Sequence, residues 1–207
     1  MESISMMALA LAGGWATGLN LYLTAVALGI AERLHWIALP GDLTILGNPL
    51  VILLVLLLYI IEFVIDKIPF LDSAWDSVHT LIRPIGGAVL VSMAYGHSPE
   101  TVQHIAAAVA GLSSLSAHLG KAGGRIVINT SPEPFSNSVA SVTEDGIVLT
   151  LLWLVFRHPV IAIVIVVGLF ALTIWLIPKV FRFMKRFFQM IAGKKPEASS
   201  EIKDQKS

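Results

Sequence analysis

The sequence predicts an all-α protein that crosses a membrane with about six transmembrane helices. Of its 207 residues, 56% are hydrophobic and only 14% are charged, whereas a soluble domain carries about 25% charged residues. The mean hydropathy is +0.79. Apolar runs recur along the chain, and several approach the ~20 residues that a helical span requires. These observations place most of the chain in a bilayer rather than in water.

The first predicted span covers residues 4–30 and is interrupted by small and polar residues. These include Gly13, Gly14, Gly18 and Asn20. The N-terminus lacks the basic segment of a cleavable signal peptide, so we expect this hydrophobic stretch to be retained as a span.

The second and third predicted spans flank a charged passage. The second span, residues 50–65, is the most hydrophobic and follows Asn48-Pro49, which is a favourable helix start. The third span, residues 85–95, is short and opens after Arg83-Pro84. Between the two spans, residues 62–84 hold acidic, basic and histidine side chains close to the membrane boundary, which suggests a functional role.

The second half of the chain contains three more predicted spans. The fourth covers residues 101–119 and is rich in Ala, Gly and Ser. A polar connection follows over residues 121–137, where two prolines two residues apart argue against a long helix. The fifth span covers residues 138–156, and the sixth, residues 160–177, is a plain apolar helix.

The spans define a transmembrane domain over residues 1–178. Residues 179–192 are predicted to form a basic amphipathic helix on an anionic membrane surface. The polar tail, residues 193–207, is expected to be disordered and cytoplasmic.

Basic residues predict the orientation in the membrane. With six spans and both termini in the cytoplasm, 12 of the 14 Lys and Arg residues lie on the cytoplasmic side. Only Arg33 and Arg157 lie on the other side. This distribution follows the positive-inside rule, so we expect an inner-membrane protein with both termini in the cytoplasm.

Composition and motifs disfavour several classes of function. The net charge is +0, which gives no indication of nucleic-acid binding. The chain has no cysteine, which rules out disulfides, thiol catalysis and thiolate metal sites. No phosphate loop, nucleophile elbow or zinc-protease helix is present. We therefore expect no cofactor, and an enzymatic function is disfavoured.

Acidic side chains of two spans are predicted to meet in a polar chamber. Glu62 and Asp66 lie one turn apart at the cytoplasmic end of the second span, and Glu144 and Asp145 lie about two turns into the fifth span from the same side. We expect a partly hydrated chamber that opens to the cytoplasm and binds a proton, a cation or a substrate. Further residues that we assign to this site are Asn20, Arg83, Ser114, His118, Lys121 and Arg125.

A structural interpretation of the same acids remains open. Asp66 could mark the membrane interface together with Lys67, and Glu62 and Glu144 could form salt bridges with Arg83 or Arg125. The adjacent pair Glu144 and Asp145 is harder to explain in this way, because the short stems of carboxylates do not reach the interface from within a span.

Asp72, Asp76 and His79 are spaced four and three residues apart, so a helix would present them on one face. Two carboxylates and an imidazole are ligands for a divalent metal. The alternative is an N-cap followed by solvated helix positions.

The first and fourth spans share a pattern that indicates an inverted repeat. Both are interrupted by small and polar residues, and Ala10-Leu-Ala-Gly13 resembles Ala108-Val-Ala-Gly111. Each span opens a group of three, so the repeats 1–97 and 98–178 would have opposite topology. Such repeats frame the substrate site of many transporters. The alternative is close packing of helices through small residues.

The chain contains two long and specific sequence motifs. One motif is Glu62-Phe63…Asp66-Lys67-Ile68-Pro69…Asp72-Ser73…Trp75-Asp76…His79-Thr80…Arg83-Pro84. The other is Asn129-Thr130-Ser131-Pro132-Glu133-Pro134-Phe135-Ser136-Asn137 followed by Glu144-Asp145. Together with Gly18-Leu19-Asn20, these motifs resemble a bacterial membrane family that is known only as a domain of unknown function, family 4126. The resemblance covers about residues 6–178. It implies a multi-span protein of the bacterial inner membrane and carries no substrate or mechanism.

Three functions are compatible with these features. The first is a small transporter, or a flippase that moves an amphiphile between leaflets, with the acids coupling transport to a proton or cation. The second is a membrane scaffold or assembly factor. The third is a metal-dependent lipid enzyme that uses Asp72, Asp76 and His79. The expected partners are the lipid bilayer, a small solute, ion or lipid, and a second copy of the chain.

Overall fold

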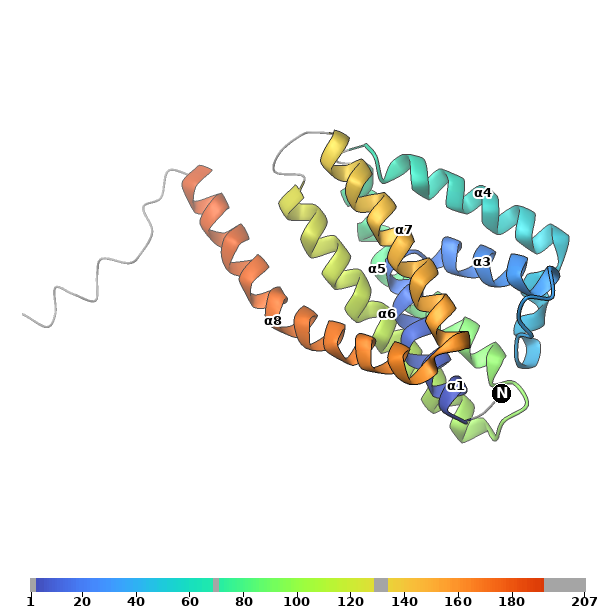
Figure 1. Ribbon diagram of the computed structural model, residues 1–207. Helices are drawn as coiled ribbons and strands as arrows, with labels where there is room; N and C mark the ends of the chain where they lie inside the picture. The colour runs from blue at the N-terminus through green and yellow to red at the C-terminus, as the bar shows by residue number, and fades with distance from the viewer. Residues whose placement is uncertain (1–2, 69–70, 129–133, 192–207) are drawn as a thin grey trace, which may run out of the picture.

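The chain is helical almost throughout, and the computed structural model describes residues 3–68, 71–128 and 134–191 (Figure 1). No β-strand occurs among these residues. The predicted all-α class is therefore confirmed for the described part of the chain. The stretch 129–133 of the second motif, Pro69 of the first motif and the expected disordered tail lie outside the described residues.

The first hydrophobic segment forms two helical arms that meet at Asn20. The first arm consists of α1 (Ser3–Ala8), the π-helical turn η1 (Leu9–Gly13) and α2 (Gly14–Leu19), and the second arm is α3 (Leu21–Arg33). Asn20 is extended, with φ −151° and ψ 101°. Its side chain accepts a hydrogen bond from Leu23 N and so caps α3. The predicted interruption of the first span is present at this residue.

Two helical elements at a sharp angle follow α3. The 3₁₀ turn η2 (Gly41–Gly47) leads into α4 (Pro49–Ile65), and the two are bent by 75°. Asn48 caps α4 through a hydrogen bond from Leu50 N, and Pro49 occupies the first helical position, where it costs no hydrogen bond. The predicted second span therefore has the predicted bounds to within one residue.

Helices α5 (Leu71–Ala94) and α6 (Glu100–Ile128) are longer than the spans predicted for them. Helix α5 continues through Pro84, and α6 has no break, so the predicted interruption of the fourth span is wrong. Lys121 and Arg125 belong to α6 and not to a polar loop. The helices extend this far because their charged side chains are paired inside the protein and need not leave the membrane.

The small residues of α6 serve close packing. A Cβ atom on Gly14 would lie 2.7 Å from the backbone of Ala110, and one on Gly18 would overlap the main-chain oxygen of Ser114. Helix α2 therefore lies directly against the backbone of α6. This is the small-residue packing that the sequence left open as the alternative to a repeat, and α6 lacks the break that the repeat would place opposite Asn20.

Helices α7 (Pro134–Arg157) and α8 (Pro159–Ile191) complete the described chain. Helix α8 continues through Pro178 and bends along its length (Figure 1). The segment expected to form a separate amphipathic helix is therefore, as far as Ile191, an extension of the sixth predicted span.

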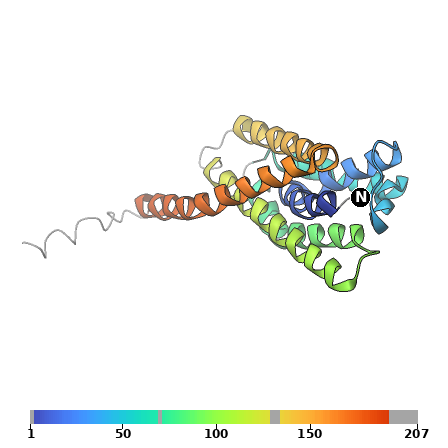
Figure 2. The same cartoon turned by 60° about the horizontal axis from the view of Figure 1, so that its bottom comes forward.

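The two arms of the first segment do not cross the helical bundle in one direction. Contacts of Gly14 with Ala110 and of Gly18 with Ser114 show that α2 runs parallel to α6, and the chain turns back at Asn20. The N-terminus consequently lies at the end of the bundle that holds the α5–α6 and α7–α8 turns, whereas α8 ends far from it (Figures 1 and 2). This arrangement differs from the single first span that the sequence suggested.

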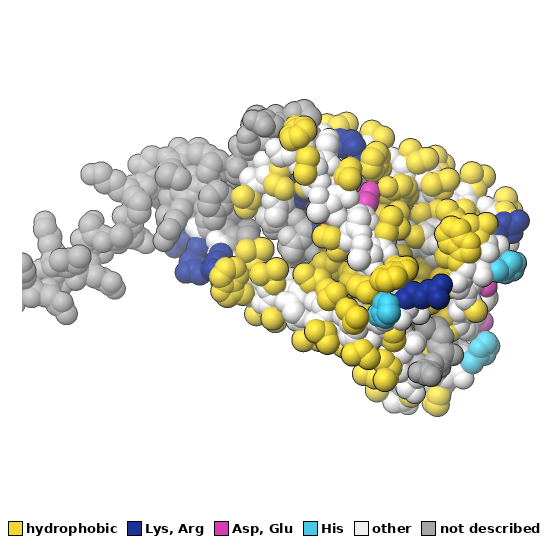
Figure 3. Space-filling model, in the orientation of Figure 1, with side chains coloured by type: hydrophobic (Ala, Val, Ile, Leu, Met, Phe, Trp, Pro, Cys, Tyr) yellow, Lys and Arg dark blue, Asp and Glu magenta, His cyan; other side chains and the backbone are white. Residues whose placement is uncertain are grey.

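Several helices have the length and composition of membrane spans. These are α5, residues 135–157 of α7 and residues 159–179 of α8, with η2 and α4 as a fourth if the bent pair counts as one span. The predicted number of six is not reached among the described residues. Large apolar side chains such as Leu50, Leu81 and Ile174 are exposed, and hydrophobic atoms cover much of the surface in Figure 3. These features are typical of a membrane protein.

Candidate functional site

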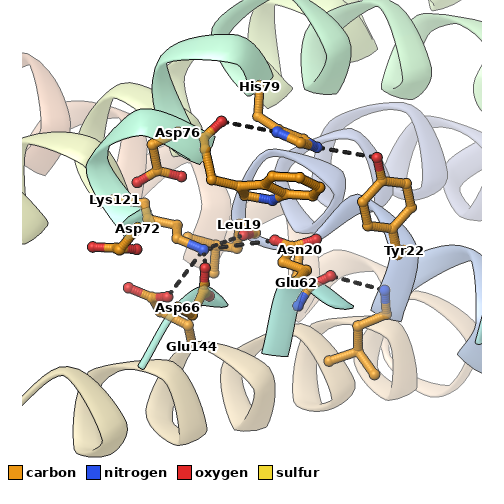
Figure 4. A network of polar contacts seen from close by, with 12 residues as sticks. Leu19, Asn20, Tyr22, Glu62, Asp66, Asp72, Asp76, His79, Lys121 and Glu144 are labelled. Atoms are coloured by element: carbon orange, nitrogen blue, oxygen red, sulfur yellow. Dashed lines mark hydrogen bonds and ion pairs between the residues drawn. The ribbon is translucent and has the colours of Figure 1, made fainter. Parts of the chain in front are cut away.

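Nine charged side chains from four helices and one connection converge in the interior. We call this group the charge cluster, and it consists of Glu62, Asp66, Asp72, Asp76, Arg83, Lys121, Arg125, Glu144 and Asp145. Figure 4 shows six of them, namely Glu62, Asp66, Asp72, Asp76, Lys121 and Glu144. Glu62, Asp72 and Arg83 have no exposed surface. The acids that the sequence assigned to the second and fifth spans therefore lie in one region of the protein. The basic residues assigned to the same site, Arg83, Lys121 and Arg125, lie there as well.

Arg83 joins α5 to α4 and to the break in the first segment. Its Nη2 lies 2.7 Å from Glu62 Oε1 and 3.2 Å from Asp76 Oδ1. Its Nη1 donates to the main-chain oxygen of Gly18 at 3.2 Å. Because that oxygen is at the C-terminus of α2, the guanidinium also meets the negative end of the helix dipole.

Lys121 lies between three carboxylates. Its ammonium is 3.0 Å from Asp66 Oδ2, 3.4 Å from Glu144 Oε2 and 3.7 Å from Glu62 Oε1 (Figure 4). It also donates to the main-chain oxygen of Leu19 at 3.3 Å. Lys121 is thus the side chain through which the acids of α4 and α7 are connected.

Arg125 holds Glu144 with two parallel hydrogen bonds. Nη2 donates to Oε2 at 2.7 Å and Nε donates to Oε1 at 3.2 Å. The remaining nitrogen, Nη1, donates to the main-chain oxygens of Asp66 and Asn137. A bidentate pair of this kind is among the stronger ion pairs in proteins, and it fixes α6 against α7.

Asp145 is hydrogen-bonded to Asn20, at the start of α3, and to Tyr59 of α4. Asn20 Nδ2 donates to Oδ1 at 3.0 Å and the Tyr59 hydroxyl donates to Oδ2 at 2.9 Å. Sequence reasoning did not assign Tyr59 to the site. Its position three residues before Glu62 on α4 is the signal that could have found it, because residues three apart share a helix face.

The hydrogen-bond partners of His118 determine its protonation state and tautomer. The Thr80 hydroxyl donates to the main-chain oxygen of Asp76, so its oxygen accepts from His118 Nε2 at 3.0 Å. Arg83 carries only donors, so His118 Nδ1 accepts from it at 3.0 Å. His118 is therefore a neutral imidazole with its proton on Nε2.

The trio Asp72, Asp76 and His79 does not form the predicted metal site. Within residues 3–68, 71–128 and 134–191, no three His, Asp or Glu side chains are arranged to hold a metal ion. His79 Nδ1 donates to the main-chain oxygen of Trp75, and Nε2 is hydrogen-bonded to the Tyr22 hydroxyl at 3.0 Å (Figure 4). Both nitrogens are thus engaged elsewhere, while Asp72 and Asp76 belong to the charge cluster.

The acids are packed against bases and do not surround the open chamber that the sequence suggested. Glu62, Asp66, Asp72 and Asp76 are buried, and the side chain of Glu144 is 17% exposed. Beside them lies a small cavity of about 140 Å³ between α5 and α6, lined by Asp76, Thr80 and Arg125 together with Ser73, Ser77, Ala122 and Ile126. The interpretation as salt bridges therefore describes the contacts of Glu62 and Glu144, but an opening is present next to Asp76.

Several carboxylate oxygens of the cluster are not hydrogen-bonded. They are Glu62 Oε2, Asp66 Oδ1 and both oxygens of Asp76, although Asp76 Oδ1 is within ion-pair distance of Arg83. Buried acceptors without a hydrogen bond are costly. The carboxylates of the cluster therefore have hydrogen-bonding capacity that the described side chains do not use. Ser114 is buried beside Gly18 and Gly87 and contributes packing rather than a contact with these acids.

Lys67 lies next to the cluster, in the connection between α4 and α5. Its ammonium donates to the main-chain oxygen of Phe63 and lies 2.9 Å from the centre of the Phe63 ring. Burial lowers the pKa of Lys67, and the neighbouring Asp66 carboxylate opposes this shift. Asp66 itself is directed toward Lys121 and is thus not an interface marker paired with Lys67.

Comparison with known proteins gives one match. A family model described as "Domain of unknown function (DUF4126)" matches residues 7–179, nearly the whole described chain. No curated protein and no solved structure matches.

Proposed function

The chain belongs to the DUF4126 family of unknown function, and on this premise we propose that it is a small transporter or flippase of the bacterial inner membrane. In this proposal, the charge cluster binds the proton or cation that is coupled to transport. The two arms that meet at Asn20 and the helices around them form the part that moves.

The observation that carries the proposal is the excess of acid in the interior. The cluster holds six carboxylates and three basic side chains, so its acids exceed its bases by three, or by two when the neighbouring Lys67 is counted. An uncompensated charge in a membrane interior costs several kcal/mol. A purely structural network would have balanced charges, whereas a site that takes up protons or cations requires an excess of acid.

The carboxylate oxygens without hydrogen bonds supply positions for that uptake. Asp76 has two such oxygens, and it lines the cavity of about 140 Å³ between α5 and α6. A proton or cation that enters this cavity meets Asp76, and Asp76 is linked to Glu62 through Arg83, which is ion-paired to both acids. Binding of a proton or cation at Asp76 would weaken the ion pair between Asp76 and Arg83. The ion pair between Arg83 and Glu62 would change in turn.

The broken first segment gives the cluster a structural element that can respond. Gly18 and Leu19 present main-chain oxygens to Arg83 and Lys121, and Asn20 holds Asp145 at the N-terminus of α3. Discontinuous helices whose ends face ions and charged groups are a recurring device of secondary transporters. A change in the charge of the cluster therefore acts on the ends of both arms.

Basic residues support an orientation with the C-terminal end of α8 in the cytoplasm. Lys179, Arg182 and Lys185 lie on this part of α8, while Arg33 and Arg157 lie near the opposite end of the bundle. In this orientation, which follows the positive-inside rule, the cavity at Asp76 lies in the cytoplasmic half of the protein. Arg83, Lys121 and Arg125 no longer count toward that rule, because they are buried and paired.

The proposal is tested with purified protein in liposomes. The probe is phosphatidylglycerol with a fluorescent nitrobenzoxadiazole group, whose movement between leaflets is followed by chemical quenching with dithionite under a pH gradient or a sodium gradient. We expect either the pH gradient or the sodium gradient to change the rate at which the labelled lipid moves between leaflets. The double substitution Glu144→Gln/Asp145→Asn should abolish that dependence, whereas the matched control Glu100→Gln, on an exposed side chain, should retain it.

Two results would contradict the proposal. One is a rate equal to that of protein-free liposomes under every gradient. The other is an unchanged gradient dependence in the double variant, provided that its elution profile and thermal unfolding match those of the wild type.

A scaffold function is the second candidate, and one feature favours it. The C-terminal half of α8 projects away from the remaining helices (Figures 1 and 2). Near the start of this half, the side chains of Ile174 and Trp175 are exposed. A partner helix could pack there. Stoichiometric co-purification of a partner from native membranes, lost on Ile174→Ser, together with no lipid movement in liposomes, would favour this function.

A further inference from the structure

An apolar cavity of about 580 Å³ lies between α3, α4 and α7, apart from the charge cluster. Side chains such as Val26, Ala27, Leu56, Leu152 and Phe156 line it. Pockets of 300–1,000 Å³ with mostly apolar walls and a few polar groups are typical of small-molecule sites.

The cavity has one polar group at each end. Tyr59 lines it at the level of Asp145, to which its hydroxyl donates, and Arg157 lines it at the C-terminal end of α7. The α7 residues that line the cavity run from Leu149 to Arg157, eight residues apart, so the cavity extends for about 12 Å along α7. This length is close to half of the ~30 Å hydrocarbon core of a bilayer, which is the depth of one leaflet.

Arg157 is suited to bind an anion. It is exposed and forms no ion pair with any described residue. Trp36 and Trp153 also line the cavity and are 68% and 56% exposed, as is typical of residues at the boundary between lipid and water. The charged end of the cavity thus faces the interface, and the apolar end faces the membrane interior.

We propose that this cavity binds one hydrocarbon chain of an amphiphile that has an anionic head group. The chain lies along α7 between α3 and α4 and ends at Tyr59, while the head group is held by Arg157. The cavity length, its apolar lining and the unpaired arginine at its outer end all fit this ligand.

Tyr59 lines the cavity and donates to Asp145 of the charge cluster, which links ligand binding to the coupling site. A chain that reaches Tyr59 displaces or confines its ring, and the Tyr59 hydroxyl holds Asp145 Oδ2. The idea that the bound amphiphile is also the transported substrate rests on the transport function proposed above. The proposal that the cavity binds an amphiphile does not depend on that function.

Binding is measured directly with cis-parinarate, a fluorescent fatty acid that accepts energy from tryptophan. Full-length protein in phosphatidylcholine nanodiscs is titrated with the acid and, separately, with its uncharged methyl ester. We expect saturable energy transfer with the acid. Arg157→Gln should weaken binding of the acid by at least about tenfold and leave the ester unchanged, whereas Arg33→Gln, an exposed arginine outside the cavity, should have no effect.

Filling the cavity tests its location. Ala27→Phe should abolish binding of the acid, and the smaller change Ala27→Leu should weaken it while perturbing the fold less. Val164→Phe, on an outward-facing side chain of α8, is the matched control and should bind normally. Unchanged binding in a folded Ala27→Phe variant, or equal affinity of the wild type for acid and ester, would overturn the proposal.

Competition identifies the source of the ligand. Displacement of the probe by oleate alone indicates a free fatty acid, and displacement by phosphatidylglycerol indicates an anionic membrane lipid. Displacement by neither would overturn the proposal. Because the assay involves no flux, saturable binding without lipid movement in liposomes would refute the transport function and leave this site standing, and the reverse result would refute the site alone.

Discussion

The side-chain amide of Asn20 donates to Asp145, which lies 125 positions later in the chain, and its carbonyl oxygen caps α3. Asn20 therefore lies between the two helical arms and caps the second one. The same side chain also hydrogen-bonds Asp145 of α7. The break in the first segment and the acidic pair in the fifth span, which the sequence suggested as separate features, are parts of one arrangement.

Asn20→Ala should destabilise the protein by about 1–3 kcal/mol. It removes an N-cap, which is worth about 1 kcal/mol, and leaves Asp145 without one of its two partners. Asn48→Ala is the matched control, because Asn48 caps α4 at an exposed position and contacts no acid. The free energy of unfolding is measured by titration with sodium dodecyl sulfate, and equal losses in the two variants would show that the Asp145 contact contributes nothing.

The pair Glu62 and Arg83 should show strong coupling in a double-mutant cycle. Arg83→Met takes from Glu62 its nearest base, leaving only Lys121 at 3.7 Å, and should cost about 3–5 kcal/mol. Adding Glu62→Leu removes that carboxylate, so the double variant should be more stable than the sum of the single changes predicts. Additive losses would contradict this expectation.

An exposed pair provides the comparison for that cycle. Glu100 and His104 lie 4.0 Å apart with side chains 84% and 69% exposed. Glu100→Gln should change stability by less than about 0.5 kcal/mol, because exposed ion pairs contribute little.

The sequence was a good guide where the signals are local. The bounds of α4 follow from an apolar run between Asn48-Pro49 and Asp66, and both ends are marked by residues that cap or end helices. The convergence of Glu62 and Glu144 on one region followed from their positions along two spans. These inferences need only helix geometry and the requirement that buried charges are paired.

The sequence was a poor guide where tertiary pairing overrides polarity. The sequence predicts Arg83 before the third span and Lys121 and Arg125 in the polar connection after the fourth, because an isolated charge in a span is costly. Each one is paired with carboxylates, so α5 and α6 continue past it. Likewise, hydropathy carries no information about direction, so the return of the chain at Asn20 could not be derived from it.

Gly18→Val should destabilise the contact between α2 and α6. A Cβ atom at Gly18 would overlap the main-chain oxygen of Ser114 and lie 2.7 Å from Ala117 Cβ, and backbone cannot yield as a flexible side chain can. We expect a loss of at least about 1–3 kcal/mol. Gly124→Ala, where a Cβ atom meets nothing within 4 Å, should instead be neutral or gain up to about 1 kcal/mol of helix propensity. Thermal unfolding in detergent distinguishes the two, and similar melting temperatures would contradict close packing at Gly18.

The return of the chain at Asn20 predicts which residues share a side of the membrane. Because the chain contains no cysteine, single substitutions can be labelled without background. Ser3→Cys and Ser98→Cys should react alike with a membrane-impermeant maleimide in intact cells, since the N-terminus and the α5–α6 turn lie at one end of the bundle (Figure 1). Lys185→Cys should react only after the cells are permeabilised, because α8 carries it to the other side. Labelling of Ser98→Cys but not Ser3→Cys in intact cells would instead require the first segment to cross the membrane once, and the position of Asn20 beside Asp145 would then need a different explanation.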